Sequence, residues 1–210
     1  MASDLLIGEA PSGIEPERWR LRAARGRRAI EEWTDILAET HVSFEVTSTK
    51  RTPSTFYGAV TRRRFGDLAM VDCASSPFVA RSPGAASVFG LMSVRKGVEQ
   101  IRERSRQLSL TAGAVMLWDG TRPVEVEVVE PFLKRTVIFP RERVLAVCPR
   151  LHESPVLPPM SESAAARLLV RYIDALAAEL AYLDEPARLV AADAALELLR
   201  AAVMPTMPSS

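Results

Sequence analysis

The side chains that most often coordinate metals or act as nucleophiles are scarce in this sequence. It contains two histidines, His41 and His152, and two cysteines, Cys73 and Cys148. Borderline metals such as Fe(II) and Zn(II) are held by several imidazole, thiolate or carboxylate donors brought close together. Neither histidine falls on an expected strand and the cysteines have no metal-like spacing. We therefore predict no metal, no cofactor and two reduced thiols, as in a cytosolic protein.

Other catalytic patterns are also weak. The sequence has no G-x-S-x-G nucleophile elbow and no glycine-rich phosphate loop. Asp119 and Arg122 share one turn and could form a catalytic pair. An aspartate that starts a turn, with a surface arginine as its partner, explains the two residues more simply. We therefore expect a protein that is not an enzyme.

Length and composition narrow the class further. A chain of 210 residues with 48% hydrophobic content can bury one sizeable core, with room for a smaller satellite. The net charge of +1 provides no field that would attract nucleic acid, a membrane surface or acidic partners. The first residues, "MASDLLIGEAPSG", have neither the basic region nor the apolar run of a signal peptide. No later segment reaches the roughly 18 uninterrupted apolar residues of a spanning helix, so we expect a cytoplasmic protein.

The chain begins with an arm and a helix. Residues 1–27 are rich in arginine, glycine and proline and lack periodicity, which predicts a flexible arm. Over residues 28–40, Ile30, Trp33 and Leu37 recur at intervals of three and four. This spacing predicts an amphipathic helix of about three turns.

Short apolar segments follow, from residue 56 to residue 139. Glycine, serine, proline or aspartate separates most of them, which favours an antiparallel sandwich or barrel over a parallel sheet. In "VEVEVV" the residues Val124, Val126 and Val128 share one face of a strand, and Glu125 and Glu127 share the other. The predicted strands are "DLAMVDCA", "SVFGLMSVRK", "VEQIRE", "QLSL", "AVMLW", "VEVEVV" and "FLKRTVIF".

The last part of the sequence has helical spacing. "PRERVLAV" suits a short helix with proline at its first position, and the prolines of "SPVLPPM" forbid a continuous helix. Ser161 is expected to cap a long helix, and the break "DEP" separates it from a second one. Two helices joined by so few residues must run antiparallel. The tail after residue 204 resembles a linker.

The order of these elements resembles the N-terminal sensor domain of the AraC/XylS family of bacterial transcription regulators, in its AraC-binding-like branch. The resemblance runs from Arg28 to Val203. It departs from the family pattern at residues 112–114, which are Ala-Gly-Ala instead of Pro-Gly-Asp, and at Glu103, where glutamine is common. Family regulators continue into two helix-turn-helix units, and nothing follows Ser210. The segments that carry the resemblance are "EEWTDILAETHVSFEV", "TRRRFGDLAMVDCASSPFVARS", "LSLTAGAVMLWDGTRPVEV", "IFPRERV" and "LLVRYIDALAAELAYLDEPARLV".

The resemblance implies an α+β fold. It would be a cupin-like antiparallel β-barrel (jelly roll), preceded by one helix and followed by an antiparallel helical hairpin. We place the barrel with its first helix at residues 28–158, the hairpin at 159–204 and a tail at 205–210. The family implies a hairpin that makes a homodimer, and its leucine stripes are broader than one short partner helix would cover. The alternative is that these stripes pack on the barrel of the same chain. The predicted dimerisation residues are Leu169, Ile173, Leu176, Leu180, Leu196 and Leu199.

The barrel interior is expected to hold a small-molecule effector. The more apolar face of the last strand aligns Leu133 and Val137 with Arg135, and an arginine facing inward would be costly unless it met an anion. The opposite phase would place Arg135 in solvent. Arg81, near the barrel mouth, is a second anion-binding candidate, and both favour an anionic or mixed polar–apolar ligand. The predicted ligand-binding residues are Arg81, Trp118, Val124, Val126, Leu133, Arg135 and Val137.

These inferences combine into one prediction and two alternatives. The prediction is the ligand-sensing and dimerisation domain of an AraC-family regulator that lacks its helix-turn-helix half. None of the predicted helices offers a basic face of the size of a DNA groove, so DNA would be bound only through that half. The alternatives are a stand-alone cupin-like enzyme and a half-length regulator that acts by heterodimerisation.

Overall fold

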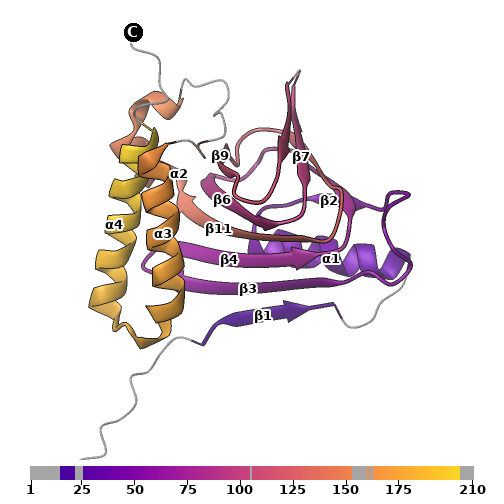
Figure 1. Ribbon diagram of the computed structural model, residues 1–210, viewed down its shortest axis with the longest axis horizontal. Helices are drawn as coiled ribbons and strands as arrows, with labels where there is room; N and C mark the ends of the chain where they lie inside the picture. The colour runs from indigo at the N-terminus through magenta and orange to yellow at the C-terminus, as the bar shows by residue number, and fades with distance from the viewer. Residues whose placement is uncertain (1–14, 22–25, 105, 153–159, 161–162, 204–210) are drawn as a thin grey trace, which may run out of the picture.

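Two antiparallel sheets face each other in the computed structural model, which describes residues 15–21, 26–104, 106–152, 160 and 163–203 (Figure 1). This is the predicted α+β fold with a cupin-like antiparallel barrel. The six-stranded sheet has the order β1 (Glu17–Arg20), β3 (Gly58–Phe65), β4 (Leu68–Ser75), β11 (Phe132–Pro140), β6 (Val88–Lys96) and β9 (Val115–Asp119). The five-stranded sheet has the order β2 (Glu45–Thr47), β5 (Phe78–Ser82), β10 (Val124–Val128), β7 (Glu99–Glu103) and β8 (Arg106–Leu110).

A first core fills the space between the sheets, and α1 (Arg27–Thr40) packs against it. Trp33 of α1 is fully buried, and its ring centroid lies 5.9 Å from that of Phe56 and 6.1 Å from that of Phe78. A Cβ atom at Gly58 would lie 2.6 Å from the Trp33 ring, so only glycine allows β3 to pass so close to the helix. The helix predicted for residues 28–40 is therefore present, with its apolar stripe on the barrel.

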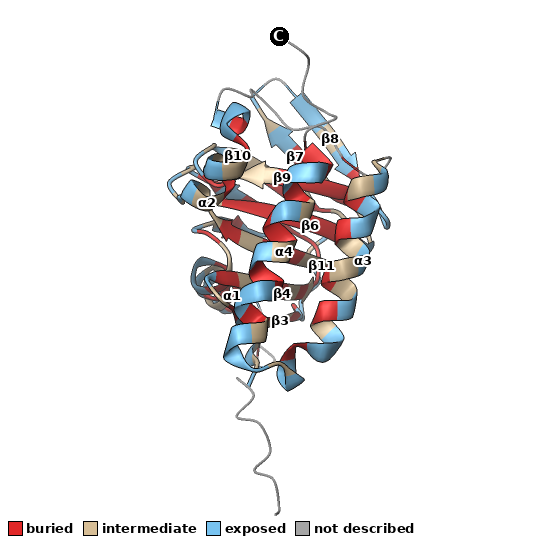
Figure 2. Ribbon diagram, turned by 90° about the vertical axis from the view of Figure 1, so that its left-hand side faces the viewer, coloured by how far each residue is buried: buried red, intermediate tan, exposed pale blue. Residues whose placement is uncertain are grey.

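A second core lies on the other face of the six-stranded sheet. It is covered by α2 (Arg141–Val147), η1 (Pro149–His152), α3 (Ala164–Glu179), η2 (Leu180–Tyr182) and α4 (Glu185–Val203). The buried residues of α3 and α4 point towards the sheet, and their exposed residues face away from it (Figure 2). No helix of the described residues is long and apolar enough to cross a membrane.

The leucine stripes of the hairpin are buried in this second core. All six residues predicted to mediate dimerisation lie at 6% exposure or less within a single chain, packed with the sheet residues Phe65, Met70 and Val137. In a single chain these six side chains therefore lie in a core and not on the surface. The physical reason is that the six-stranded sheet is apolar on both faces and needs a cover on the outer one.

An ion-pair network ties the hairpin to the outer face of the sheet. Arg135 of β11 donates to the two carboxylate oxygens of Asp72 at 2.6 and 3.1 Å, and to Asp174 of α3 at 3.0 Å. Arg63 also donates to Asp72, at 2.8 Å. Burial raises the pKa of the Asp72 carboxyl, but the hydrogen bonds and charges of Arg135 and Arg63 outweigh it and leave the pKa lowered.

Three local predictions need correction. The flexible arm was expected to include residues 17–20, which instead form β1 and pair with β3. Arg62 of β3 holds this strand, since it donates to Glu17 at 2.6 Å and its guanidinium lies 4.9 Å from the centroid of the Trp19 ring. The rest of the arm, apart from residues 15–16, 21 and 26–27, lies outside the described residues.

The helix ends also differ from the prediction. Ser163 caps α3 by accepting a hydrogen bond from the backbone N–H of Ala166, whereas the predicted cap, Ser161, lies outside the described residues. Pro140 occupies the N-cap position of α2, one residue before the first helical one.

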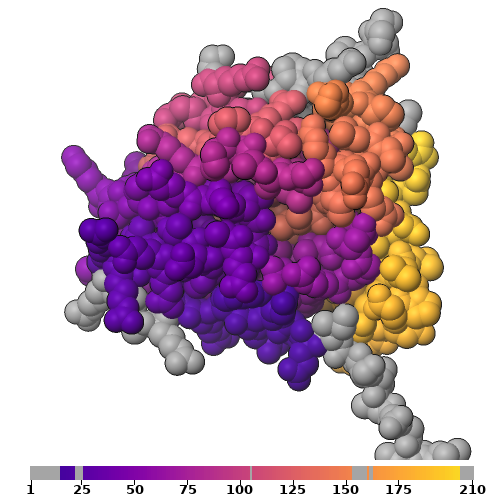
Figure 3. Space-filling model, turned by 180° about the vertical axis from the view of Figure 1, so that it is seen from behind, coloured from indigo at the N-terminus to yellow at the C-terminus, as the bar shows by residue number. Residues whose placement is uncertain are grey.

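Seen from behind, the N-terminal segments cover much of the surface and α4 lies along one side (Figure 3).

Candidate functional site: a polar pocket between the sheets

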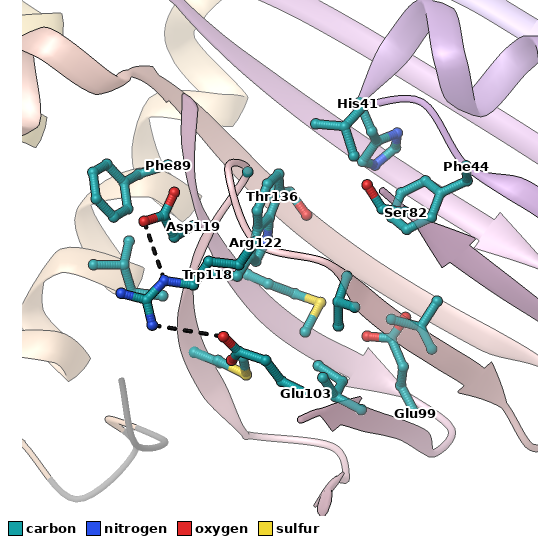
Figure 4. A pocket seen from close by; sticks show the side chains of 18 of the residues that line it. His41, Phe44, Ser82, Phe89, Glu99, Glu103, Trp118, Asp119, Arg122 and Thr136 are labelled. Carbon is teal, nitrogen blue, oxygen red and sulfur yellow. Dashed lines mark ion pairs between the residues drawn. The ribbon is translucent and has the colours of Figure 1, made fainter. Parts of the chain in front are cut away.

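A small pocket lies between the two sheets, with a volume of about 70 Å³ (Figure 4). Its walls are mainly apolar and include Phe44, Phe89, Trp118 and Val126. Such a lining with a few polar groups is typical of small-molecule sites. The polar lining residues are His41, Ser82, Glu99, Glu103, Asp119, Arg122, Lys134 and Thr136.

Strand alternation explains which side chains face the pocket. In β7, Glu99, Ile101 and Glu103 are spaced by two and point to the same side. In β11 the inward residues are Lys134 and Thr136, while the residues that alternate with them, such as Val137, face the helices.

Lys134 and Glu99 form an ion pair at the bottom of the pocket. The Lys134 Nζ atom donates to Glu99 Oε1 at 2.9 Å, and only 1% of the Glu99 side chain is exposed. Burial, the largest single effect, lowers the pKa of Lys134, but the charge of Glu99, its hydrogen bond to Lys134 and a contribution from Cys73 together outweigh burial and leave the pKa raised. Burial also raises the pKa of the neighbouring Cys73 thiol to about 12, so this thiol stays protonated.

A second cluster lines the pocket at the ends of β7 and β9. Arg122 Nη1 lies 3.6 Å from Glu103 Oε1, and Arg122 Nε lies 3.4 Å from Asp119 Oδ2 (Figure 4). Arg141, the first residue of α2, donates to Asp119 Oδ1, which also accepts from the backbone N–H of Thr121 at 3.0 Å. Burial raises the pKa of Asp119, but the hydrogen bonds from Arg141 and Thr121 outweigh it and lower the pKa.

The interpretation of Asp119 and Arg122 as a surface turn is therefore incomplete. Asp119 does start the turn, but only 5% of its side chain is exposed, and both residues line the pocket. The turn folds over the rim of the pocket, and a sequence pattern cannot show this.

His41 presents an unprotonated nitrogen to the pocket. The hydroxyl of Thr40 donates its one proton to the Ile36 carbonyl at 2.6 Å, so its oxygen accepts from His41 Nδ1–H at 2.9 Å. Burial, followed by the positive charges of Lys134 and Arg62, lowers the pKa of the imidazole to about 3. His41 is thus neutral near pH 7, and its Nε2 atom is a hydrogen-bond acceptor with no partner among the described residues.

Three of the seven predicted ligand-binding residues line this pocket: Trp118, Val124 and Val126. The other four lie elsewhere. Arg81 is exposed and donates to Glu125 at 2.6 Å. Arg135 and Val137 face the helical hairpin, because the inward face of β11 is the opposite of the predicted one. Leu133 is 40% exposed.

Sequence reasoning missed the polar pocket residues almost completely. Residues spaced by two along a strand share a face. Glu99 therefore shares a face of β7 with Ile101, and Lys134 and Thr136 share a face of β11 with Ile138. This alternation was the one available indication. His41 directly follows α1, and nothing in its sequence context indicates that its ring reaches the interior. Among the described residues, no three His, Cys, Asp or Glu side chains form a group that could hold a metal ion.

Comparison with known proteins identifies the fold. The family model of the AraC-binding-like domain matches residues 33–203. The chain belongs to the AraC-binding-like domain family. This confirms the resemblance seen in the sequence.

Two individual proteins extend the comparison. A Bacillus sp. (strain OxB-1) protein, described as an uncharacterized protein in the nit 5' region, is 26% identical over 178 residues, which cover 81% of this chain and 68% of that protein. The crystal structure of the AraC-like transcriptional activator CuxR superposes with a TM-score of 0.79 at 14% identity, over 93% of this chain and 72% of CuxR. At this identity, the likeness to CuxR shows a shared fold.

Proposed function

We propose that this chain is the effector-sensing domain of an AraC-type transcription regulator and binds a small molecule between its two sheets. The observation that supports this most is the pocket itself, whose apolar walls enclose polar atoms with no partner among the described residues. Structural cores pair such atoms, whereas binding sites leave them for the ligand. In this proposal, DNA is bound by a helix-turn-helix part outside this chain.

A chain of ion pairs supplies a route from the pocket to the helices. Asp119 in the pocket wall accepts from Arg141 at the start of α2. Two residues later, Arg143 donates to Asp67 and to Asp193 of α4, each at 2.6 Å. A ligand that binds beside Asp119 changes the charge balance at the start of α2, and with it the position of α2 on α4. The proposed signal is this change.

Dimerisation is the second part of the proposal, with a different surface from the predicted one. Because the leucine stripes are buried in the chain itself, we assign the contact between chains to the outer face of the hairpin. The hairpin exposes Leu168 of α3, Tyr182 of η2 and Val190 of α4, at 56%, 73% and 69%. Exposed large apolar side chains are the groups that a contact between two chains would bury. A Leu168→Glu variant should sediment as a folded monomer, and an unchanged dimer would exclude this face.

We propose a binding role and not a catalytic one. Efficient acid–base catalysts have pKa values near the working pH. In this pocket the pKa of His41 is lowered to about 3 and that of Lys134 is raised, so neither group exchanges protons near neutrality. Metal analysis of the purified protein tests the alternative of a cupin-like enzyme, since a stoichiometric transition metal would contradict the sensor proposal.

A pair of tryptophan variants tests where effectors bind. In a thermal-shift screen of small molecules, compounds that stabilise the protein should fail to stabilise Val124→Trp, whose indole fills the pocket. The matched control is Leu133→Trp, on the opposite side of the same barrel and 40% exposed, and it should respond like the unmodified protein. Stabilisation that survives in Val124→Trp would place the binding site elsewhere and contradict the proposal.

A further inference from the structure

We propose that the pocket takes a small, uncharged ligand that donates hydrogen bonds through hydroxyl groups, such as a short polyol. This inference rests on the proposed function of the same site and replaces the expectation of an anionic ligand. It follows from three observations: which pocket atoms already have partners, how the charges balance, and how large the cavity is.

The charged hydrogen-bond donors of the pocket are already engaged. Lys134 donates to Glu99, Arg141 donates to Asp119, and Arg122 lies between Asp119 and Glu103. A ligand whose main groups are acceptors, such as a carboxylate or a phosphate, would have to take these donors from buried carboxylates. Leaving a buried carboxylate without its partner is costly, so such ligands are disfavoured.

The acceptors, in contrast, are unpaired. Glu99 Oε2 and Thr136 Oγ1 are buried and have no hydrogen-bond partner among the described residues, and both side chains lie in the pocket (Figure 4). At 1% exposure each, Glu99 and Thr136 are not solvated from the surface. His41 Nε2 adds a third acceptor, because its Nδ1–H is used by Thr40. A complementary ligand therefore places hydrogen-bond donors near Glu99, Thr136 and His41.

The charges of the pocket cancel, which excludes a cationic donor. The carboxylates of Glu99, Glu103 and Asp119 are matched by the cations Lys134, Arg122 and Arg141, and His41 is neutral near pH 7. An ammonium group would meet Lys134 and Arg122 with no net negative charge to offset its desolvation. Hydroxyl groups donate without carrying a charge, and a hydroxyl can also accept from Thr136.

The size of the cavity sets the scale of the ligand. Its 70 Å³ is about half of an engineered ~150 Å³ cavity that holds benzene. This space suits a chain of about two or three carbons, whose C–H surface packs against the apolar wall near Trp118.

The test compares probes of equal size and different charge. Binding of ethylene glycol to the full chain is measured by saturation-transfer NMR and by calorimetry at pH 7, against the carboxylate acetate and the amine ethanolamine. We expect ethylene glycol to bind at least about tenfold more tightly than either charged probe. Thr136→Val, which keeps the side-chain shape but removes the free hydroxyl, should weaken ethylene glycol binding about tenfold.

The control for that variant is Ser93→Ala, which removes a hydroxyl from the outer face of the same sheet, where Ser93 lies beside Arg135. It should bind ethylene glycol like the unmodified protein, and circular dichroism checks the fold of both variants. Tighter binding of acetate or of the amine, or absence of ethylene glycol binding at 50 mM, would overturn the ligand class. The sensor proposal would then still be judged separately by the Val124→Trp comparison. Equal ethylene glycol binding by Thr136→Val and Ser93→Ala would overturn the assigned position.

Discussion

The two faces of β11 use the same kinds of residues for different purposes. On the outer face, Arg135 makes three hydrogen bonds to Asp72 and Asp174, and Val137 is buried under the helices. On the inner face, Lys134 has one carboxylate partner, and the hydroxyl of Thr136 has no partner among the described residues. Both faces bury charge, but only the outer one satisfies its polar atoms. The difference separates a surface that holds the fold together from one that is free to bind a ligand.

The largest expected effect comes from breaking the outer face with a charge. Leu176→Glu should prevent folding, because Leu176 is only 6% exposed where it packs against the sheet. Burying an unpaired carboxylate there should cost more free energy than the roughly 5–15 kcal/mol by which a domain of this kind is stable. Circular dichroism and sedimentation velocity measure the result. A folded monomer with an intact barrel would show that the hairpin does not need the sheet.

Removing the ion-pair network should have the next largest effect. Arg135→Ala leaves Asp72 and Asp174 without their main partner and should lower the free energy of unfolding by about 3 kcal/mol. The matched control is Arg81→Ala, an exposed pair with Glu125 that should cost about 1 kcal/mol or less. Equal losses in chemical denaturation would mean that the Arg135 network does not hold the outer face.

The inner face should be visible in the pH dependence of stability. The pKa of His41 is about 3 in the folded state, below its ordinary value of 6.5. Between these two pH values the unfolded chain therefore binds one more proton than the folded chain. The contribution of His41 is therefore complete above pH 6.5 and is lost as the pH falls towards 3, at up to about 1.4 kcal/mol per pH unit. Asp72 and Asp119, whose pKa values are lowered from 3.8, lose their contributions only as the pH falls below about 3.8, at the acid end of this range.

Urea titrations between pH 6.5 and pH 4.5 isolate this effect. His41→Asn should flatten the slope, whereas His152→Asn, an exposed residue of η1, should leave it unchanged. A slope that persists in His41→Asn would assign it to another group.

The smallest stability effect is expected at Thr136. Its hydroxyl has no partner among the described residues, so Thr136→Val removes a buried unsatisfied group and should change the free energy of unfolding by less than about 1 kcal/mol, or raise it. A loss of 2 kcal/mol or more in urea denaturation would show that this oxygen has a structural partner.

The same comparison shows what the sequence could reveal. The apolar stripe of α1 and the alternation of Val124 and Val126 were predictable, because each element has one buried face and one exposed face. Strand β11 is covered on both sides, so its alternation does not indicate which face is inward, and Arg135 was assigned to the wrong one.

Other features depend on contacts between distant segments. The pair of Lys134 and Glu99 joins β11 to β7 across the barrel, and the role of His41 depends on how α1 meets the sheets. The leucine stripe of α3 indicated that it would be buried, but a pattern within one chain does not distinguish its own sheet from a second copy. These features follow from tertiary packing, which local periodicity does not encode.

The most direct test of the account is a crystal structure of the protein with ethylene glycol, the shortest ligand of this class. The account predicts the polyol between the sheets, with its hydroxyl groups within hydrogen-bond distance of Glu99 Oε2 and Thr136 Oγ1 and the ion pair of Lys134 and Glu99 unchanged. A polyol found only on the surface, with the pocket oxygens still unpaired, would contradict the claim that the inner face is a ligand site.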